Sequence, residues 1–189
     1  PQDAPVALLE AEFAELLGAR YAVAVSSCSA ALFLSLKALD LKPGAKVLIP
    51  AFTFAAVPSA VVHAECVPVL VEVDDSLRID MADFAAKLPG AEAVIISHMR
   101  GHTSDMDAIM AIAGRPKLVG IEDGCQAIGA EDKGRRAGSV GHYGCFSFFP
   151  SKNLGGAGDG GMVVMRDTDR DTKIRRLRNH GMEPKYCHH

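Results

Sequence analysis

Short apolar runs alternate with longer amphipathic segments along the whole chain. The short runs are typical of buried strands, and the longer segments, with apolar residues three or four positions apart, are typical of helices. Regular alternation of the two predicts an α/β fold: a doubly wound, mostly parallel sheet with helices on both faces. The expected strands cover residues 21–25, 46–50, 67–73, 93–97, 118–122, 146–149 and 160–166.

Capping residues mark where several of the expected helices begin. Asp3, Asp80 and Asp105 each precede a segment with helical periodicity, and an aspartate side chain can accept a hydrogen bond from a free amide of the first turn. The last helix carries a basic face that we expect to be solvated rather than to bind an anion. The expected helices cover residues 3–17, 30–39, a segment ending near 64, 80–88, 105–113 and 167–178.

Composition narrows the class of protein. The chain has 189 residues, of which 49% are hydrophobic, enough for one well-packed domain. A net charge of −3 without a long basic run argues against a nucleic-acid-binding protein. The five cysteines are scattered without a CxxC pair, which favours buried thiols in a reducing compartment. With no apolar run of membrane-spanning length and no signal peptide, we expect a cytoplasmic protein.

A lysine follows the expected strand 146–149. Pro150 ends this strand because it has no amide hydrogen, and Lys152 precedes a glycine-rich run. Because lysine is costly to bury, it either extends to solvent or is held for chemistry, where its amine can form a Schiff base with an aldehyde. Taken alone, the stretch favours a surface lysine in a flexible loop.

Two carboxylates, Glu122 and Asp123, stand at the end of the expected strand 118–122. Ligands of open α/β sheets bind at the carboxyl ends of the strands. A carboxylate there can pair with a ring nitrogen of a cofactor, as it does in PLP sites. An N-cap leading into a helix over residues 124–130 is an equally good alternative.

Two further segments suggest a cofactor site. The serines around Cys28 stand at a strand-to-helix turn, where hydroxyls and free amides suit a phosphate, although a plain serine cap is the simpler reading. Phe54 could stack on a flat ring, although most phenylalanines pack in a core.

Two other patterns are weaker. Gly156, Gly158 and Gly161 satisfy the dinucleotide-binding spacing, but that motif must open a helix and residues 162–165 predict a strand. These glycines are instead expected to let the backbone pass close to the lysine.

A second pattern brings two histidines and two aspartates into one short segment, but they straddle a strand end and a helix cap, so we expect no metal site. That set is His98, His102, Asp105 and Asp107.

Several motifs together resemble one family. "EDGCQAIGA" followed by "GCFSFFPSKNLGGAGDGG" resembles the DegT/StrS-type nucleotide-sugar aminotransferases, which are PLP enzymes of fold type I. "AVAVSSCSAAL" is similar to the phosphate loop of that family, "IPAFTFAA" to its cofactor-stacking segment, and "LRNHG" to a loop near its active site. The resemblance covers nearly the whole chain, with the motifs in the family's order.

The resemblance implies a role for each matching residue. Lys152 would hold pyridoxal 5'-phosphate and move a proton between substrate and cofactor, and Asp123 would pair with the pyridine nitrogen. Lys152 also separates this chain from relatives that carry histidine there and work as sugar dehydratases. Cys28 stands where the family often has glycine. The implied cofactor-binding residues are Cys28, Ser29, Phe54, Asp123, Gln126, Ser147 and Lys152, with Gln126 near the ring hydroxyl and Ser29, Ser147 and the amides around Cys28 at the phosphate.

The resemblance also implies an activity and an assembly. An amino acid, expected to be glutamate, would donate its amino group to a keto sugar nucleotide, in a homodimer with shared active sites. Family members are roughly twice as long, so residues 1–189 would form the PLP-binding large domain without the small C-terminal domain. The alternatives are another fold-type-I enzyme such as a lyase, a non-catalytic PLP-binding regulatory protein, and a nucleotide-binding oxidoreductase domain.

Overall fold

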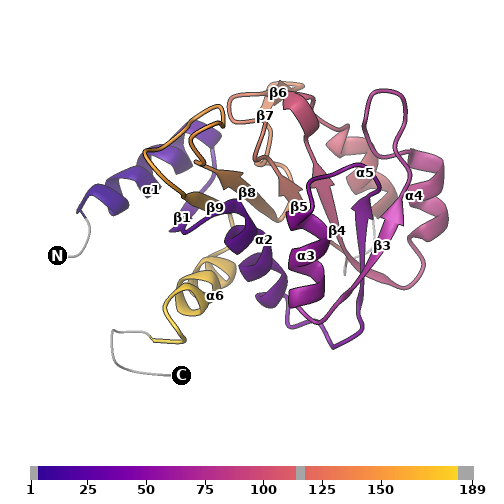
Figure 1. Ribbon diagram of the computed structural model, residues 1–189, viewed down its shortest axis with the longest axis horizontal. Helices are drawn as coiled ribbons and strands as arrows, with labels where there is room; N and C mark the ends of the chain where they lie inside the picture. The colour runs from indigo at the N-terminus through magenta and orange to yellow at the C-terminus, as the bar shows by residue number, and fades with distance from the viewer. Residues whose placement is uncertain (1–3, 114–117, 183–189) are drawn as a thin grey trace.

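The computed structural model describes residues 4–113 and 118–182, which form an α/β fold around a seven-stranded sheet (Figure 1). The strand order is β1-β9-β8-β5-β4-β2-β3. Strands β8, β5, β4, β2 and β3 are parallel, whereas β9 runs antiparallel to both β1 and β8. The strands are β1 (Tyr21–Val25), β2 (Lys46–Pro50), β3 (Val67–Val71), β4 (Ala91–Ser97), β5 (Val119–Asp123), β8 (Tyr143–Ser147) and β9 (Gly161–Met165).

Helices cover both faces of the sheet, as the sequence predicts. One face packs against α2 (Cys28–Lys37), α3 (Ala56–His63) and α6 (Thr168–Arg178). The other face packs against α1 (Ala4–Leu17) at one end and against α4 (Met81–Lys87) and α5 (Met106–Ala113) at the other. Successive residues of a strand face opposite sides, so Val163 joins the core under α2 while Val164 packs under α1.

The predicted boundary of strand β8 is wrong. The strand covers Tyr143–Ser147 rather than residues 146–149, and Phe149 is 48% exposed. After Ser147 the chain leaves the sheet, and the Phe148 carbonyl accepts a hydrogen bond from the Gly156 amide at 2.7 Å. The aromatic run therefore divides between the core, where Phe146 lies, and the mouth of a cavity.

The helix caps confirm most of the expected starts. Asp80 accepts from the Asp83 amide at 2.8 Å, and Asp105 accepts from the Ala108 amide at 3.1 Å. Asp3 lies outside the described residues. The N-cap alternative for Asp123 is wrong, because residues 124–130 form turns and the aspartate is the last residue of β5.

Short elements complete the chain. Strands β6 (Glu131–Asp132) and β7 (Arg135–Arg136) form a tight hairpin, with Gly134 at a positive φ of 74°. A 3₁₀ turn, η1 (Met99–Gly101), follows β4. No helix in the described part of the chain is both long and apolar enough to cross a membrane.

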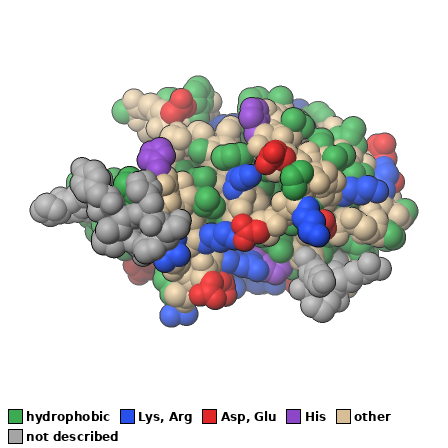
Figure 2. Space-filling view, turned by 90° about the horizontal axis from the view of Figure 1, so that it is seen from below, with side chains coloured by type: hydrophobic (Ala, Val, Ile, Leu, Met, Phe, Trp, Pro, Cys, Tyr) green, Lys and Arg blue, Asp and Glu red, His purple; other side chains and the backbone are tan. Residues whose placement is uncertain are grey.

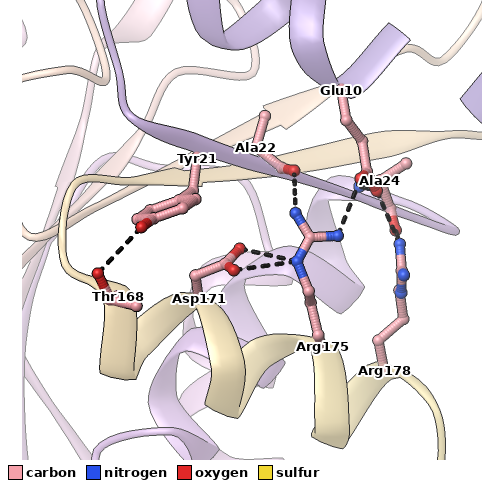
Figure 3. A network of polar contacts seen from close by, with 8 residues as sticks. All are labelled: Glu10, Tyr21, Ala22, Ala24, Thr168, Asp171, Arg175 and Arg178. Atoms are coloured by element: carbon pink, nitrogen blue, oxygen red, sulfur yellow. Dashed lines mark hydrogen bonds and ion pairs between the residues drawn. The ribbon is translucent and has the colours of Figure 1, made fainter. Parts of the chain in front are cut away.

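The basic face of α6 is not simply solvated, which corrects the expectation. Arg175 binds Asp171 at 2.9 Å, Glu10 of α1 at 2.9 Å and the Ala22 carbonyl of β1 at 3.1 Å (Figure 3). Arg178 also binds Glu10, at 2.8 Å. Basic and acidic side chains lie intermixed on the face of the molecule seen in Figure 2.

Candidate active site

A cavity of about 410 Å³ opens where β5 and β8 end and α2 begins. This is the carboxyl edge of the parallel strands, where α/β sheets bind ligands. Six of the seven predicted cofactor-binding residues line it. They are Cys28, Ser29, Phe54, Asp123, Ser147 and Lys152.

Asp123 presents a buried carboxylate to this cavity. The side chain is 5% exposed and accepts hydrogen bonds from the Cys125 amide at 3.1 Å, the Ser97 hydroxyl at 3.4 Å and the Cys28 thiol at 3.7 Å. Burial raises the pKa of Asp123, and the Cys125 amide only partly offsets it. No lysine or arginine of the described chain forms an ion pair with this carboxylate, so a cationic ligand group would be stabilised against it.

Glu122, the preceding residue, points away from the cavity into a closed network. Its carboxylate binds His98 Nε2 at 2.8 Å and accepts from the amides of Gly138 at 2.8 Å and Val140 at 2.7 Å. The ring nitrogen Nδ1 of His98 accepts from the Ser104 amide, so Nε2 carries the proton that is donated to Glu122. Although burial acts in the opposite direction, the His98 hydrogen bond and the amides of Gly141 and Gly138 hold the pKa of Glu122 below its ordinary value. This network fixes the end of β5 that carries Asp123.

Lys152 lies half-buried in a turn after β8. Its amide donates to the Phe149 carbonyl at 2.8 Å, which closes the turn, and the residue lines the cavity. Within residues 4–113 and 118–182 the amine forms no hydrogen bond or ion pair. An amine held in this way is available to an electrophilic ligand such as an aldehyde.

The first turn of α2 forms an anion-binding end of the cavity. Ser27 is the N-cap and accepts from the Ala30 amide at 3.1 Å, while the preceding amides of the first turn stay unpaired within the helix. Gly161, the first residue of β9, passes so close that a Cβ there would lie 2.4 Å from the Ser27 carbonyl carbon and 2.8 Å from the Cys28 nitrogen. Only glycine fits at this position without displacing the first turn of α2.

The glycine-rich loop after Lys152 behaves partly as expected. A Cβ on Gly155 would lie 2.3 Å from the Pro150 carbonyl oxygen, so this glycine allows the loop to pass close beside the lysine turn. Gly158 has nothing within 4 Å of such a Cβ. The segment from Gly161 is strand β9, not a helix, which removes the basis of the dinucleotide pattern.

Two predicted residues occupy less enclosed positions. Phe54 is 65% exposed at the edge of the cavity, so its ring is open to a flat ligand. Gln126 is not among the cavity-lining residues; its Oε1 accepts from the amide of Arg100, at 2.8 Å. The predicted contact between Gln126 and a ring hydroxyl stays a prediction.

The sequence reasoning did not assign Cys125 and Asp159, which also line the cavity. Cys125 is two residues from Asp123, a spacing that brings a side chain back to the same side after a turn. Hydrogen bonding between the two thiols raises the pKa of Cys28, with burial adding to it, and lowers the pKa of Cys125. Asp159 lies in the glycine-rich loop, and no motif in the sequence marks it as a cavity-lining residue.

The histidine and aspartate segment after β4 does not form one ligand set. His98 is bound to Glu122, whereas Asp105 and Asp107 form ion pairs with Lys133 at 2.9 and 3.3 Å. Among the described residues, only Cys28, Asp123 and Cys125 bring three possible metal-ligand atoms together, within 4.8 Å of one another.

Comparison with known proteins identifies the family. The model of the DegT/DnrJ/EryC1/StrS aminotransferase family matches residues 4–189. A curated relative, the UDP-N-acetyl-3-dehydro-alpha-D-glucosamine 3-aminotransferase of Acidithiobacillus ferrooxidans, is 48% identical over 95% of this chain and 49% of its own length. The chain therefore spans about half the length of this curated relative.

Solved structures share the fold. A DegT DnrJ EryC1 StrS aminotransferase from Brucella abortus has a TM-score of 0.94 and 32% identity, over all of this chain and 53% of its own. NtdA from Bacillus subtilis, solved with the bound cofactor PMP, has a TM-score of 0.88 and 33% identity, over 94% of this chain and 40% of its own. The resemblance found in the motifs is thus confirmed, and this chain belongs to the DegT/DnrJ/EryC1/StrS aminotransferase family.

Proposed function

We propose that this chain is the cofactor-binding part of a PLP-dependent aminotransferase that moves an amino group from an amino acid to a keto sugar nucleotide. The observation that carries the proposal is the cavity itself, where the amine of Lys152 and the buried carboxylate of Asp123 line the same space. PLP has an aldehyde, a pyridine nitrogen and a phosphate. The cavity offers an amine, a buried carboxylate and a helix N-terminus, one partner for each.

Each residue has a defined task at this site. Lys152 Nζ would hold PLP through its aldehyde and, when free, would carry a proton to and from the substrate carbon. Asp123 would pair with the protonated ring nitrogen, which its carboxylate favours because it has no cationic partner among the described residues. The amides of Cys28 and Ser29 and the hydroxyl of Ser147 would bind the phosphate. PLP supplies an electron-withdrawing ring that stabilises the negative charge left on the substrate carbon when its proton leaves.

The substrates and the assembly belong to the same proposal. The name of the Acidithiobacillus relative supports a nucleotide-linked keto sugar as amino acceptor, and we expect glutamate as donor. We further propose a cytoplasmic homodimer with shared active sites. Residues 1–189 would be its large PLP-binding domain, and the small C-terminal domain would lie outside this sequence.

A visible absorption spectrum of the purified protein tests the cofactor and the first half of the reaction. We expect a band of bound PLP that shifts when glutamate is added, because the amine of the donor replaces Lys152 at the aldehyde. In Lys152→Ala the band of the lysine-bound form should be absent. Serine at the neighbouring cavity position gives a matched control, since Ser151→Ala should keep the band.

The outcomes separate the alternatives. A glutamate-dependent shift followed by amination of a keto sugar nucleotide supports the transferase. A lyase would convert its amino substrate without passing the amine to a sugar, and a regulatory protein would bind PLP and ignore every donor. Failure of the protein to bind PLP at all would contradict the cofactor assignment.

A further inference from the structure

Two thiols and one carboxylate converge in the cavity beside the proposed cofactor position. The sulfur of Cys28, the sulfur of Cys125 and a carboxylate oxygen of Asp123 all lie within 4.8 Å of one another. Cys28 and Asp123 are 9% and 5% exposed, and Cys125 is half-buried. The proposed aminotransferase reaction uses neither sulfur, so this pair of thiols has no assigned task.

The spacing matches the ligand shell of a zinc-like cation. Zinc binds thiolate sulfur at about 2.3 Å and carboxylate oxygen at about 2.0 Å in a tetrahedral arrangement, which places sulfur and oxygen ligands about 3.5 Å apart. The distance from Cys28 Sγ to Asp123 Oδ1 is 3.7 Å. Small side-chain rotations would therefore bring three ligand atoms onto one ion.

The surroundings suit such an ion. Three protein ligands leave the fourth tetrahedral position open to the cavity, where water or another ligand can bind. Two thiolates, one carboxylate and a divalent cation sum to a single negative charge. Lys152, which lines the same cavity and acts electrostatically on Cys125, is positioned to offset that charge.

We propose that Cys28, Cys125 and Asp123 form a binding site for a thiophilic divalent cation such as Zn²⁺. Binding releases the two thiol protons to solvent and leaves two sulfur–metal bonds and one oxygen–metal bond. The cation occupies the carboxylate that the proposed function assigns to the pyridine nitrogen. If that function holds, zinc and PLP compete, and the cation site keeps the cofactor out.

Cadmium serves as a spectroscopic probe, because cadmium bound to thiolate has a charge-transfer band in the ultraviolet. The full-length protein, freed of PLP and metal and kept reduced with a phosphine, is titrated with Cd²⁺. We expect a saturable band with one ion per chain. Cys28→Ala and Cys125→Ala should each weaken cadmium binding by at least about tenfold, since each removes a direct ligand.

Cys66→Ala is the matched control. Cys66 is also a buried cysteine, at 6% exposed, but it precedes β3 at the opposite edge of the parallel sheet and binds the Ala64 carbonyl. This variant should keep the cadmium band, and circular dichroism should confirm that all three variants are folded. Survival of the cadmium band in folded Cys28→Ala and Cys125→Ala would overturn the site. Absence of a cadmium band in a protein whose thiols are shown by titration to be free would overturn it as well. Recovery of the pair as a disulfide under the same reducing conditions would also overturn it.

Competition tests the link to the cofactor separately. Zinc at ten times its own Kd should raise the PLP concentration for half-saturation about tenfold, and this effect should be lost in Cys125→Ala. Thiol-dependent cadmium binding without competition would support the cation site and contradict the placement of PLP against Asp123. The failure of the cation site and the failure of the proposed function are thus distinguishable.

Discussion

At the scale of single residues, two neighbouring carboxylates have opposite environments. Successive residues of a strand point to opposite sides, so Glu122 and Asp123 face different surroundings at the end of β5. Glu122 is saturated by a histidine and by backbone amides, whereas Asp123 faces a cavity without a cationic partner among the described residues. Glu122 therefore stabilises the fold, whereas Asp123 can bind a cationic ligand group.

The substitution Glu122→Gln tests the structural role. An amide of the same shape keeps one acceptor oxygen but turns an NH₂ group toward donors that the carboxylate now satisfies. We expect the free energy of unfolding, measured with urea, to fall by about 3 kcal/mol. Glu131→Gln removes a similar charge from an exposed pair with Arg136 and should cost less than about 0.5 kcal/mol. Equal losses in the two variants would contradict the argument.

The substitution Asp123→Asn should separate stability from binding. Its carbonyl oxygen can still accept from the Cys125 amide, while the cost of burying a charge disappears. We expect the stability of the PLP-free protein to stay level or rise by up to about 1 kcal/mol. PLP affinity, followed by its absorbance, should fall at least about tenfold because the pyridine nitrogen loses its partner.

Asp159→Asn is the control for this loss of charge. Asp159 lines the same cavity but is exposed, so its substitution should change PLP affinity by less than about threefold. A strong loss of stability in Asp123→Asn would instead show that the carboxylate supports the fold.

At the scale of elements, the site depends on how closely β9 approaches the start of α2. Gly161 pairs with Val25 of β1 on one side and with Ser147 of β8 on the other. It therefore stands in the sheet at the point where the first turn of α2 begins. A strand residue with a side chain would push this turn away from the cavity.

Gly161→Ala should open the anion-binding end of the cavity. The new Cβ would meet backbone atoms of Ser27 and Cys28, which cannot rotate away. We expect PLP affinity to fall at least about tenfold, since the amides of the first turn of α2 lose their alignment. Gly158→Ala, in the loop that precedes β9 and with nothing within 4 Å of the new Cβ, should bind PLP like the unchanged protein. The PLP affinities of the two variants, measured side by side, test whether the anion-binding end of the cavity depends on glycine at position 161.

Hydrophobic periodicity predicted the elements well because most of them bury a regular face. The start of β8 was missed because position 144 requires glycine rather than a hydrophobic residue. The backbone of Gly138 passes so close that a Cβ on Gly144 would lie 2.0 Å from the Gly138 carbonyl oxygen. The antiparallel direction of β9 was not predicted, since direction depends on a tertiary path that a five-residue pattern does not encode. Six of the cavity-lining residues followed from motifs, whereas Cys125 and Asp159 did not, and Cys125 lies at the cavity only because a turn folds it back onto Asp123.

At the scale of the whole molecule, one polar network joins segments from both ends of the described chain. Glu10 of α1 binds Arg175 and Arg178 of α6, and it also accepts from the Ala24 amide of β1 at 2.8 Å (Figure 3). The two helices lie on opposite faces of the sheet, and the edge strand β1 runs between them. This edge holds the strand that leads directly into α2, so its stability bears on the cofactor site.

Replacing Arg175 by methionine tests how far this network holds the edge. The substitution keeps the aliphatic part of the side chain but removes the Nε–H group that contacts both carboxylate oxygens of Asp171, which is 8% exposed, and removes one bond to Glu10. We expect the free energy of unfolding in urea to fall by about 2 kcal/mol. Amide hydrogen exchange in α1 and β1 should accelerate more than in β4, because the loss is local to the edge.

Lys173→Met provides the comparison within the same helix. Among the described residues Lys173 pairs only with Asp40, whose side chain is 77% exposed, so the substitution should cost less than about 0.5 kcal/mol. If both variants lose the same stability, or if exchange accelerates evenly over the sheet, the network does not hold the edge. If only Arg175→Met loosens α1 and β1, the base of the cofactor cavity depends on a contact between helices that are more than 150 residues apart in the sequence.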